Sequence, residues 1–285
     1  MDYKTSDGIA LTFQKPEGKG KFAVIILCHG FCGIREILLP DFAEAFNKAG
    51  FSTITFDYLG FGDSDGERGR IEPEKQIKDI LSVLDWARKQ PEIDENRIAL
   101  WGTSFGGCHV FGAAVNNPFV KCIVSQLAFA DGEEIVTSNM TDSEKDNFIT
   151  SLNSMHEKKK NTGKEIFVGV NRILNDPDSR HFFDENKINH PELNIKIPFL
   201  TVRNTLLYKP AINAEKVTCP TLVIAAGKDI VNPPEQGQAL FNAVKADKKS
   251  FYIEENARHY DMYAGEYFAR VSKLQIDWFR THLLQ

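Results

Sequence analysis

The sequence has no excess of basic charge. Its 34 Lys and Arg stand against 39 Asp and Glu, which gives a formal net charge of −5. The run Lys158-Lys159-Lys160 is best interpreted as a solvated helix end. No basic stripe favours a nucleic-acid partner, and the acidic excess is too mild to indicate another partner. With 42% hydrophobic and 26% charged residues, the 285-residue chain has a globular composition and suits one large domain with a full core.

Long apolar runs are also missing. No segment approaches the ~18 consecutive apolar residues of a membrane-spanning helix. The first residues, Met1 to Asp7, contain no apolar signal region. We therefore expect a cytoplasmic protein with no membrane partner.

The cysteines do not form an obvious framework of disulfides or metal ligands. There are five, an odd number, and three lie in or beside apolar runs. Buried free thiols in a reducing compartment fit this usage best. Cys28 and Cys32 have no second pair at zinc-ligand spacing, and Cys28 falls inside an expected strand. We therefore predict no metal site, and nothing in the sequence calls for a cofactor.

Expected strands and helices alternate through most of the chain. Apolar runs predict strands at residues 9–13, 22–27, 51–56, 98–101, 121–127, 219–226 and 250–253. Helical spacing of apolar residues predicts helices at 41–49, 73–90, 108–115, 233–244 and 263–282. This alternation predicts an α/β fold, with a mostly parallel central sheet and helices on both faces.

The alternation stops between residues 131 and 216. This stretch is polar and partly helical, with scattered phenylalanines. A structureless loop of that length would be unusual inside a compact domain. We therefore predict an inserted, mostly helical cap at 131–216, and a core made of residues 1–130 and 217–285.

Ser104 lies between two glycines, Gly102 and Gly106, directly after an expected strand. Gly-x-Ser-x-Gly is the pattern of a nucleophile elbow, a sharp strand-to-helix turn that presents a serine above the sheet. Glycine at these positions removes side chains that would clash in the turn. Such a pattern also arises by chance in glycine-rich turns. The hypothesis that Ser104 is a nucleophile therefore depends on its context: the expected strand before it, the helix after it and candidate partner residues downstream.

A serine hydroxyl needs a base, usually a histidine oriented by a carboxylate. Asp229 and His259 each follow an expected strand, so a parallel sheet would bring both to the same edge as Ser104. Asp131, which follows the 121–127 strand, remains the alternative acid. If Asp131 has this role, Asp229 is an ordinary turn residue. His109, in the helix after Ser104, is expected to pack there.

Five segments form a pattern in a fixed order: Cys28-His29-Gly30-Phe31, Asp57 to Ser64, the Ser104 turn, Gly227-Lys228-Asp229 and the late His259. Together they resemble the α/β-hydrolase superfamily over nearly the whole chain outside the insertion. Within it, the chain is most similar to bacterial esterases near the dienelactone-hydrolase and prolyl-oligopeptidase-like branches, including some feruloyl esterases.

The resemblance implies an oxyanion hole made by the backbone N–H groups of Phe31, or less readily Cys32, and Phe105. It also implies a structural role for His29. In the segment from Asp57, Leu59 stands where the family has an arginine, which puts the ion pair of that arginine in doubt. A serine nucleophile separates the chain from the dehalogenases and epoxide hydrolases, which use a carboxylate, and from the dienelactone hydrolases, which use a thiol.

We therefore predict a serine hydrolase that cleaves a carboxylester with a small to medium, apolar or aromatic acyl group, using Ser104, His259 and Asp229. The same residues would serve a thioesterase, an acyltransferase or a carbon–carbon bond hydrolase. A ligand-binding protein that kept the fold is the non-enzyme alternative. The expected partner is a small-molecule ester, and a homodimer is left open.

Overall fold

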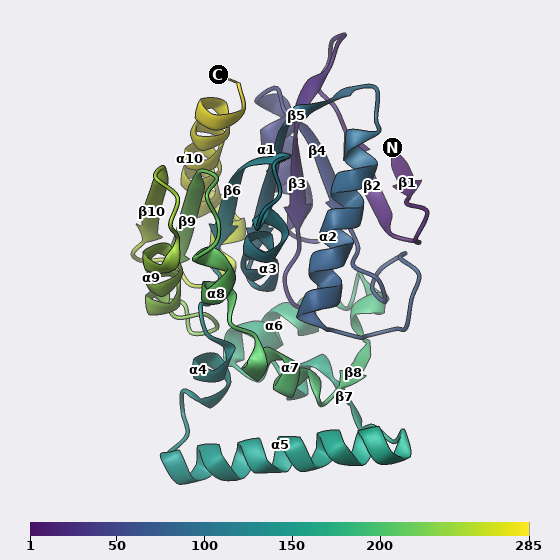
Figure 1. Cartoon of the computed structure of the whole chain (residues 1–285), viewed down its shortest axis with the longest axis vertical. Coiled ribbons are helices and arrows are strands. Elements are labelled where there is room, and N and C mark those ends of the chain that lie inside the picture. Colours follow the sequence, from purple (N-terminus) through teal and green to yellow (C-terminus); the bar gives the residue numbers. More distant parts are fainter. Residues whose placement is uncertain (285) are drawn as a thin grey trace.

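The central sheet of the computed structural model, which describes residues 1–284, has eight strands in the order β1-β2-β4-β3-β5-β6-β9-β10 (Figure 1). The β1–β2 and β2–β4 pairs are antiparallel, and every other pair is parallel. The strands are β1 (Asp2–Lys4), β2 (Ala10–Gln14), β3 (Phe22–Cys28), β4 (Ser52–Phe56), β5 (Ile93–Thr103), β6 (Val120–Gln126), β9 (Thr221–Ala226) and β10 (Lys249–Glu254).

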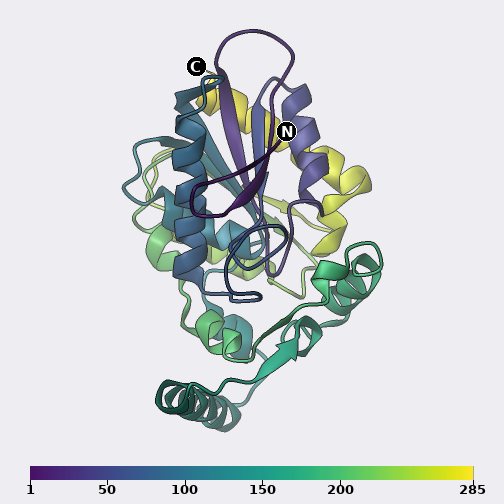
Figure 2. The ribbon, with the colours of Figure 1, turned by 90° about the vertical axis from the view of Figure 1, so that its right-hand side faces the viewer.

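Helices cover both faces of this sheet (Figure 2). On one face lie α1 (Leu39–Lys48) and α10 (Gly265–Leu283), and on the other lie α2 (Pro73–Arg88), α3 (Phe105–Ala114) and α9 (Pro234–Ala243). Alternate side chains of β3 enter different cores: Ile25 packs on the α1 side and Ile26 on the α2 side. Two covered faces explain why the central strands read as continuous apolar runs. The predicted α/β fold is confirmed.

The segment between β6 and β9, which we call the insertion (residues 131–216), lies at the end of the sheet where the parallel strands finish (Figures 1 and 2). Its β7 and β8 form a separate antiparallel pair. Its elements are α4 (Gly132–Thr137), α5 (Asp142–Thr162), β7 (Phe167–Gly169), the 3-10 helix η1 (Val170–Arg172), α6 (Pro177–Asn186), the 3-10 helix η2 (Pro191–Leu193), β8 (Lys196–Pro198), α7 (Thr201–Leu207) and α8 (Pro210–Ala214).

Helix α5 is polar along most of its length but has clear start and stop signals. Thr141 and Glu144 form a capping box at its beginning, and Gly163 ends it with a φ of 69°, a conformation that glycine adopts without strain. Its apolar side, with Phe148 and Leu152, packs against α7. The insertion is mostly helical; its standing as a separate domain stays a prediction.

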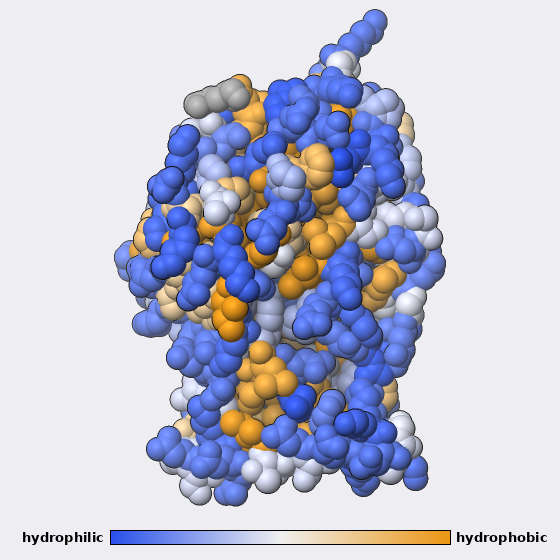
Figure 3. Space-filling view, in the orientation of Figure 1, coloured by the Kyte–Doolittle hydropathy of each residue, from blue (hydrophilic) through white to orange (hydrophobic). Residues whose placement is uncertain are grey.

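The surface seen from the direction of Figure 1 is mostly hydrophilic (Figure 3). Hydrophobic side chains gather along the middle of this face and over the upper part of the insertion. Leu207 on α7 and Ile212 on α8 are among the exposed apolar residues, at 56% and 54%. No helix within residues 1–284 combines the length and the apolar character needed to cross a bilayer.

Candidate active site

Ser104 occupies the turn between β5 and α3, with φ 53° and ψ −122°. A non-glycine residue rarely adopts a positive φ, so the turn is strained. A Cβ atom at Gly102 would collide with the carbonyl of Gly106, and one at Gly106 would collide with the carbonyl of Cys28. Both glycines are therefore required by close backbone approach, as an elbow demands.

His259 and Asp229 form a buried pair. The Nδ1 atom of His259 lies 2.7 Å from Oδ2 of Asp229, and the two residues are 2% and 4% exposed. The other oxygen of Asp229 accepts the N–H groups of Val231 at 2.8 Å and Asn232 at 2.9 Å. A carboxylate accepts hydrogen bonds, so Nδ1 carries the hydrogen that faces Asp229, and Nε2 is the ring atom directed away from the carboxylate.

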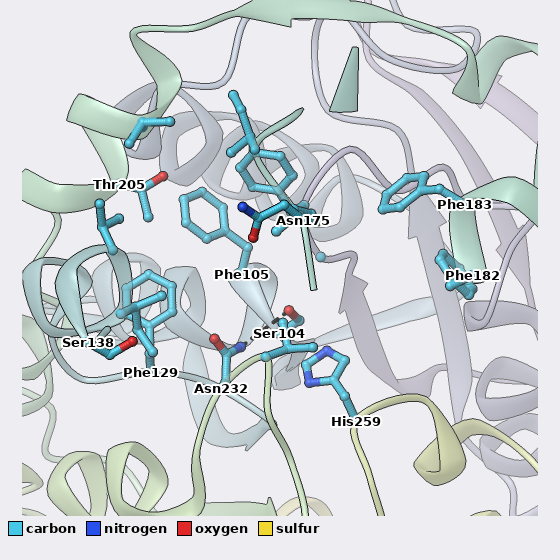
Figure 4. Close-up of a pocket in the computed structure, with 18 of the residues that line it drawn as sticks. Ser104, Phe105, Phe129, Ser138, Asn175, Phe182, Phe183, Thr205, Asn232 and His259 are labelled. Atoms are coloured by element: carbon cyan, nitrogen blue, oxygen red, sulfur yellow. Dashed lines mark hydrogen bonds between the residues drawn. The ribbon is translucent and has the colours of Figure 1, made fainter. Parts of the chain in front are cut away.

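Ser104 and His259 line the same cavity, and Figure 4 shows the imidazole turned toward the serine. Within residues 1–284, no hydrogen bond joins the two side chains in this conformation. The Ser104 hydroxyl oxygen is instead 3.5 Å from Nδ2 of Asn232. The structure thus brings the three predicted residues to one edge of the sheet.

Asp131, the alternative acid, is engaged elsewhere. It caps the N-terminus of α4, where Oδ1 accepts the N–H groups of Glu133 at 2.8 Å and Glu134 at 3.3 Å. The same oxygen pairs with the ammonium group of Lys209. In this structure the carboxylate beside His259 belongs to Asp229.

The loop after β3 passes close to the serine. A Cβ atom on Gly30 would lie 3.0 Å from the Cβ atom of Ser104, a tight contact that glycine avoids. The ring of Phe31 packs edge-on against Phe105, with centroids 5.6 Å apart. Phe105 is the first residue of α3, and the first N–H groups of a helix have no partner within it. Phe31 and Phe105 therefore lie with Ser104 in the wall of one cavity, and the role of their N–H groups as oxyanion donors stays a prediction.

His29 holds this loop in shape. Its Nδ1 accepts the N–H of Gly30 at 2.7 Å, and its Nε2 lies 2.8 Å from the carbonyl of Ile37 and donates to it. Burial lowers the pKa of His29 to about 4, so the ring is neutral near pH 7. These bonds give His29 the structural role that the resemblance implied.

The carboxylate of Asp57 is paired with an arginine that sequence reasoning missed. The backbone N–H of Arg35 donates to Asp57 Oδ1 at 2.7 Å, and the guanidinium pairs with Oδ2. Arg35 thus supplies the positive charge that Leu59 lacks. No local spacing signals this contact, since 22 residues separate the partners. The pair connects the loop that carries Phe31 to the loop that begins at Asp57.

Three carboxylates, those of Glu36, Asp57 and Asp63, lie within 4.8 Å of one another. Each also faces the guanidinium of Arg35, at 3.2 Å for Glu36 and 2.7 Å for Asp63. The arginine therefore offsets part of the negative charge of this group, and the arrangement is an ion-pair network.

His109 packs beneath the serine turn, as expected. Its Nε2 lies 3.0 Å from the amide oxygen of Gln76, and its Nδ1 lies 3.0 Å from the hydroxyl of Tyr208. Complete burial lowers the pKa of His109 to about 3. The ring ties α3 to α2 and to the segment between α7 and α8.

The cavity above Ser104 has a volume of about 480 Å³ and is bounded by both the core and the insertion. Its walls are mainly apolar, and the polar side chains among them include those of Ser104, His259 and Asn232 (Figure 4). A more polar cavity of about 570 Å³ adjoins it and shares Ser138, Met140 and Asn175. Apolar side chains that line the first cavity include Ile135, Phe148, Phe182, Phe183, Phe199 and Val202.

A serine on a strained strand-to-helix turn, at the carboxyl edge of a mostly parallel sheet, characterises an α/β hydrolase. The chain belongs to the family described as serine aminopeptidase, S33, whose model matches residues 20–263. The resemblance to α/β hydrolases is therefore confirmed, and membership indicates a hydrolase.

Individual proteins extend this comparison. The chain is 61% identical to an uncharacterised 31.7 kDa protein of Escherichia coli from the traX-finO intergenic region, over 99% of both chains. It is 28% identical to the thiohydrolase aneE of Aspergillus aculeatus, over 97% of this chain and 91% of that one. The structure of DcsB in complex with its substrate analogue aligns with a TM-score of 0.83 and 26% identity, over 100% and 99% of the two chains.

Proposed function

We propose that this protein is a serine hydrolase that cleaves carboxylesters through an acyl-enzyme on Ser104. The observation that carries the proposal is the 2.7 Å bond between His259 and Asp229, in the wall of the cavity that also contains Ser104. A carboxylate that fixes the imidazole tautomer leaves Nε2 able to take a proton, which is the property of a general base.

In the first half of the reaction, His259 Nε2 takes the hydroxyl proton while Ser104 Oγ attacks the acyl carbonyl. Asp229 stabilises the imidazolium, and the N–H groups of Phe31 and Phe105 stabilise the oxyanion. The imidazolium then protonates the departing alcohol. Water enters, loses a proton to the same imidazole, and releases the acid. Every step uses groups of the chain itself and water, so we propose no cofactor.

The cavity supports an apolar or aromatic acyl group of small to medium size. Its volume of about 480 Å³ lies in the range of small-molecule sites, and phenylalanines such as Phe182 and Phe199 line it. The adjoining polar cavity offers room for the leaving group. A small-molecule ester is accordingly the proposed partner.

Thioester hydrolysis is the second candidate, and one finding favours it. A relative that matches nearly the whole chain is a thiohydrolase. The same serine and base would attack a thioester carbonyl, and the better leaving group would place less demand on the imidazolium as an acid. Acyl transfer to an alcohol would follow the same first step.

The proposed setting is the cytoplasm, without nucleic acid or membrane partners. All five cysteines are free thiols, and four of them are buried, as suits a reducing compartment. Light scattering in solution would distinguish a monomer from a homodimer.

A pair of serine variants tests the proposal. Ser104→Ala should abolish hydrolysis of p-nitrophenyl butyrate and labelling by a fluorophosphonate probe. Ser151→Ala, on the exposed surface of α5, should retain both. Thermal unfolding of the two variants checks that each is folded. Labelling of folded Ser104→Ala at the wild-type rate would reject the nucleophile. Comparing kcat/KM for butyryl esters and butyryl thioesters, with acid and transfer products measured separately, ranks the candidate reactions.

A further inference from the structure

Asn232 contacts the oxygen atom that the proposed reaction would use. It lies in the loop after β9, three residues beyond Asp229, and is 6% exposed. Its Nδ2 donates to the carbonyl of Leu127 at 2.7 Å and lies 3.5 Å from Ser104 Oγ (Figure 4).

The orientation of this amide follows from its partners. A backbone carbonyl such as that of Leu127 can only accept, so the atom facing it must be the NH₂ group. One hydrogen of that group serves Leu127. The second hydrogen is then available to the serine oxygen.

The amide is fixed before any substrate arrives. The backbone N–H of Asn232 donates to Asp229 Oδ1 at 2.9 Å, which anchors the residue to the acid beside His259. Leu127, at the end of β6, is held in turn by its N–H bond to the carbonyl of Ile224 at 2.8 Å. The Asn232 amide is therefore fixed both through its backbone and through its bond to Leu127. Because the amide cannot easily follow the Ser104 oxygen, it stabilises most the states in which that oxygen lies close to Nδ2.

We propose that Asn232 is a catalytic residue that stabilises Ser104 Oγ as the leaving group when the acyl-enzyme is hydrolysed. This inference rests on the proposed serine mechanism. In that step, water attacks the acyl carbon and gives its proton to His259. The C–Oγ bond then breaks, and Oγ keeps the bonding electrons and receives the proton from the imidazolium. Negative charge grows on Oγ as this bond breaks, and an N–H donor aimed at it lowers the barrier.

The first half of the reaction gains less from the same contact. There, Oγ attacks with a lone pair while His259 removes its proton. A hydrogen bond to Oγ stabilises any charge left by the proton but also lowers the nucleophilicity of the oxygen. These effects oppose each other, so Asn232 acts mainly on release of the acid.

The test is the fraction of enzyme present as acyl-enzyme during turnover. Asn232→Ala and Asn232→Leu, in the full chain, would be mixed with p-nitrophenyl butyrate, quenched with acid and weighed by mass spectrometry. We expect kcat to fall roughly 10- to 100-fold, as for the loss of a hydrogen bond to a charged group. The butyryl adduct on Ser104 should rise well above the wild-type fraction. Fluorophosphonate labelling, which needs only the attack, should stay within about threefold.

Asn47→Ala is the matched control, because the Asn47 amide also donates to a backbone carbonyl, that of Phe51, far from the site. It should change neither kcat nor the adduct. An adduct fraction in folded Asn232 variants that is unchanged or lower would overturn the inference. Wild-type protein that neither reacts with the fluorophosphonate nor hydrolyses the ester would instead reject the serine mechanism itself, so the two failures are distinguishable.

Discussion

Tyr260 and Phe182 stack face to face, with ring centroids 4.5 Å apart and ring planes inclined by 15°. Tyr260 follows His259 in the chain, whereas Phe182 belongs to α6 of the insertion. The Tyr260 hydroxyl also donates to Ser179 Oγ, on the same helix, at 3.2 Å. The loop that carries the proposed base is therefore attached to the insertion, so the position of α6 and the position of His259 depend on each other.

Removing this stack should loosen α6 and widen the cavity. An aromatic pair contributes about 0.5–1.5 kcal/mol beyond its buried area, and Phe182 also forms part of the cavity wall. For Phe182→Ala we expect KM for p-nitrophenyl butyrate to rise several-fold and kcat to fall less. Amide hydrogen exchange in residues 177–186 should become faster. The control is Arg258→Gln, since the exposed Arg258 side chain faces Asp178 of α6 at 3.5 Å and such pairs contribute little. Unchanged exchange in α6 of Phe182→Ala would refute the attachment.

Variants of two aspartates, Asp229 and Asp131, test which of them is the acid of the proposed triad. Asp229→Asn places an amide against Nδ1 of His259, which favours the wrong tautomer, and in a comparable triad this change lowers kcat by about 10⁴. Asp131→Asn keeps a good N-cap for α4 and loses only the charge opposite Lys209. We expect steady-state rates to fall by at least about 10³ for the first variant and by less than about threefold for the second. The reverse order would make Asp131 the acid.

The sequence was sufficient for seven of the eight strands of the central sheet and for placing Ser104, Asp229 and His259 at its edge. The apolar run at 22–27 arises because the strand is covered on both faces, and the glycines around Ser104 arise because the backbone segments approach closely. Each feature leaves a signal within a few consecutive residues. The three-residue strands β1, β7 and β8 were not predicted, because segments this short have no readable period.

The missed contacts of the site are all long-range. Arg35 meets Asp57, and Asn232 meets Ser104, only after separate loops have folded against one another. Neither residue stands at a motif position, and the separations of 22 and 128 residues depend on the path of the chain. Asp229 could be proposed from its motif, whereas the choice between it and Asp131 required the direction of the His259 ring.

The pair of Arg35 and Asp57 should be important for stability. Both side chains are nearly inaccessible, at 9% and 0%. Burial raises the pKa of Asp57 even beside the guanidinium, which shows how costly the lone charge would be. For Arg35→Met we expect the free energy of unfolding to fall by about 3–5 kcal/mol, as for a buried pair that loses one partner. Urea unfolding at pH 7.5 measures this loss.

The double variant Arg35→Met/Asp57→Asn checks the cause of that loss. It removes the unpaired charge, so it should recover part of the stability. A double variant no more stable than Arg35→Met would show that the arginine acts through packing rather than charge.

Two buried histidines should make the fold sensitive to mild acid. The pKa values of His29 and His109 are lowered by burial from 6.5 to about 4 and about 3. Between these values and pH 6.5, the unfolded chain binds protons that the native protein does not, so stability falls as the pH falls through this window. Each group changes the free energy of unfolding by about 1.4 kcal/mol per pH unit there, or about 2 kcal/mol between pH 7.5 and 5.0.

His109→Gln isolates one of these contributions, because glutamine retains polar atoms for Gln76 and Tyr208 but does not titrate. Its stability at pH 7.5 should be lower than that of the wild type, since the ring leaves a gap in a packed site. Its loss of stability between pH 7.5 and 5.0, measured by urea unfolding, should be smaller by about 2 kcal/mol. His181→Gln, an exposed position on α6, should reproduce the wild-type loss. A loss in His109→Gln as large as in the wild type would mean that His109 is already protonated in the folded protein at pH 5.0.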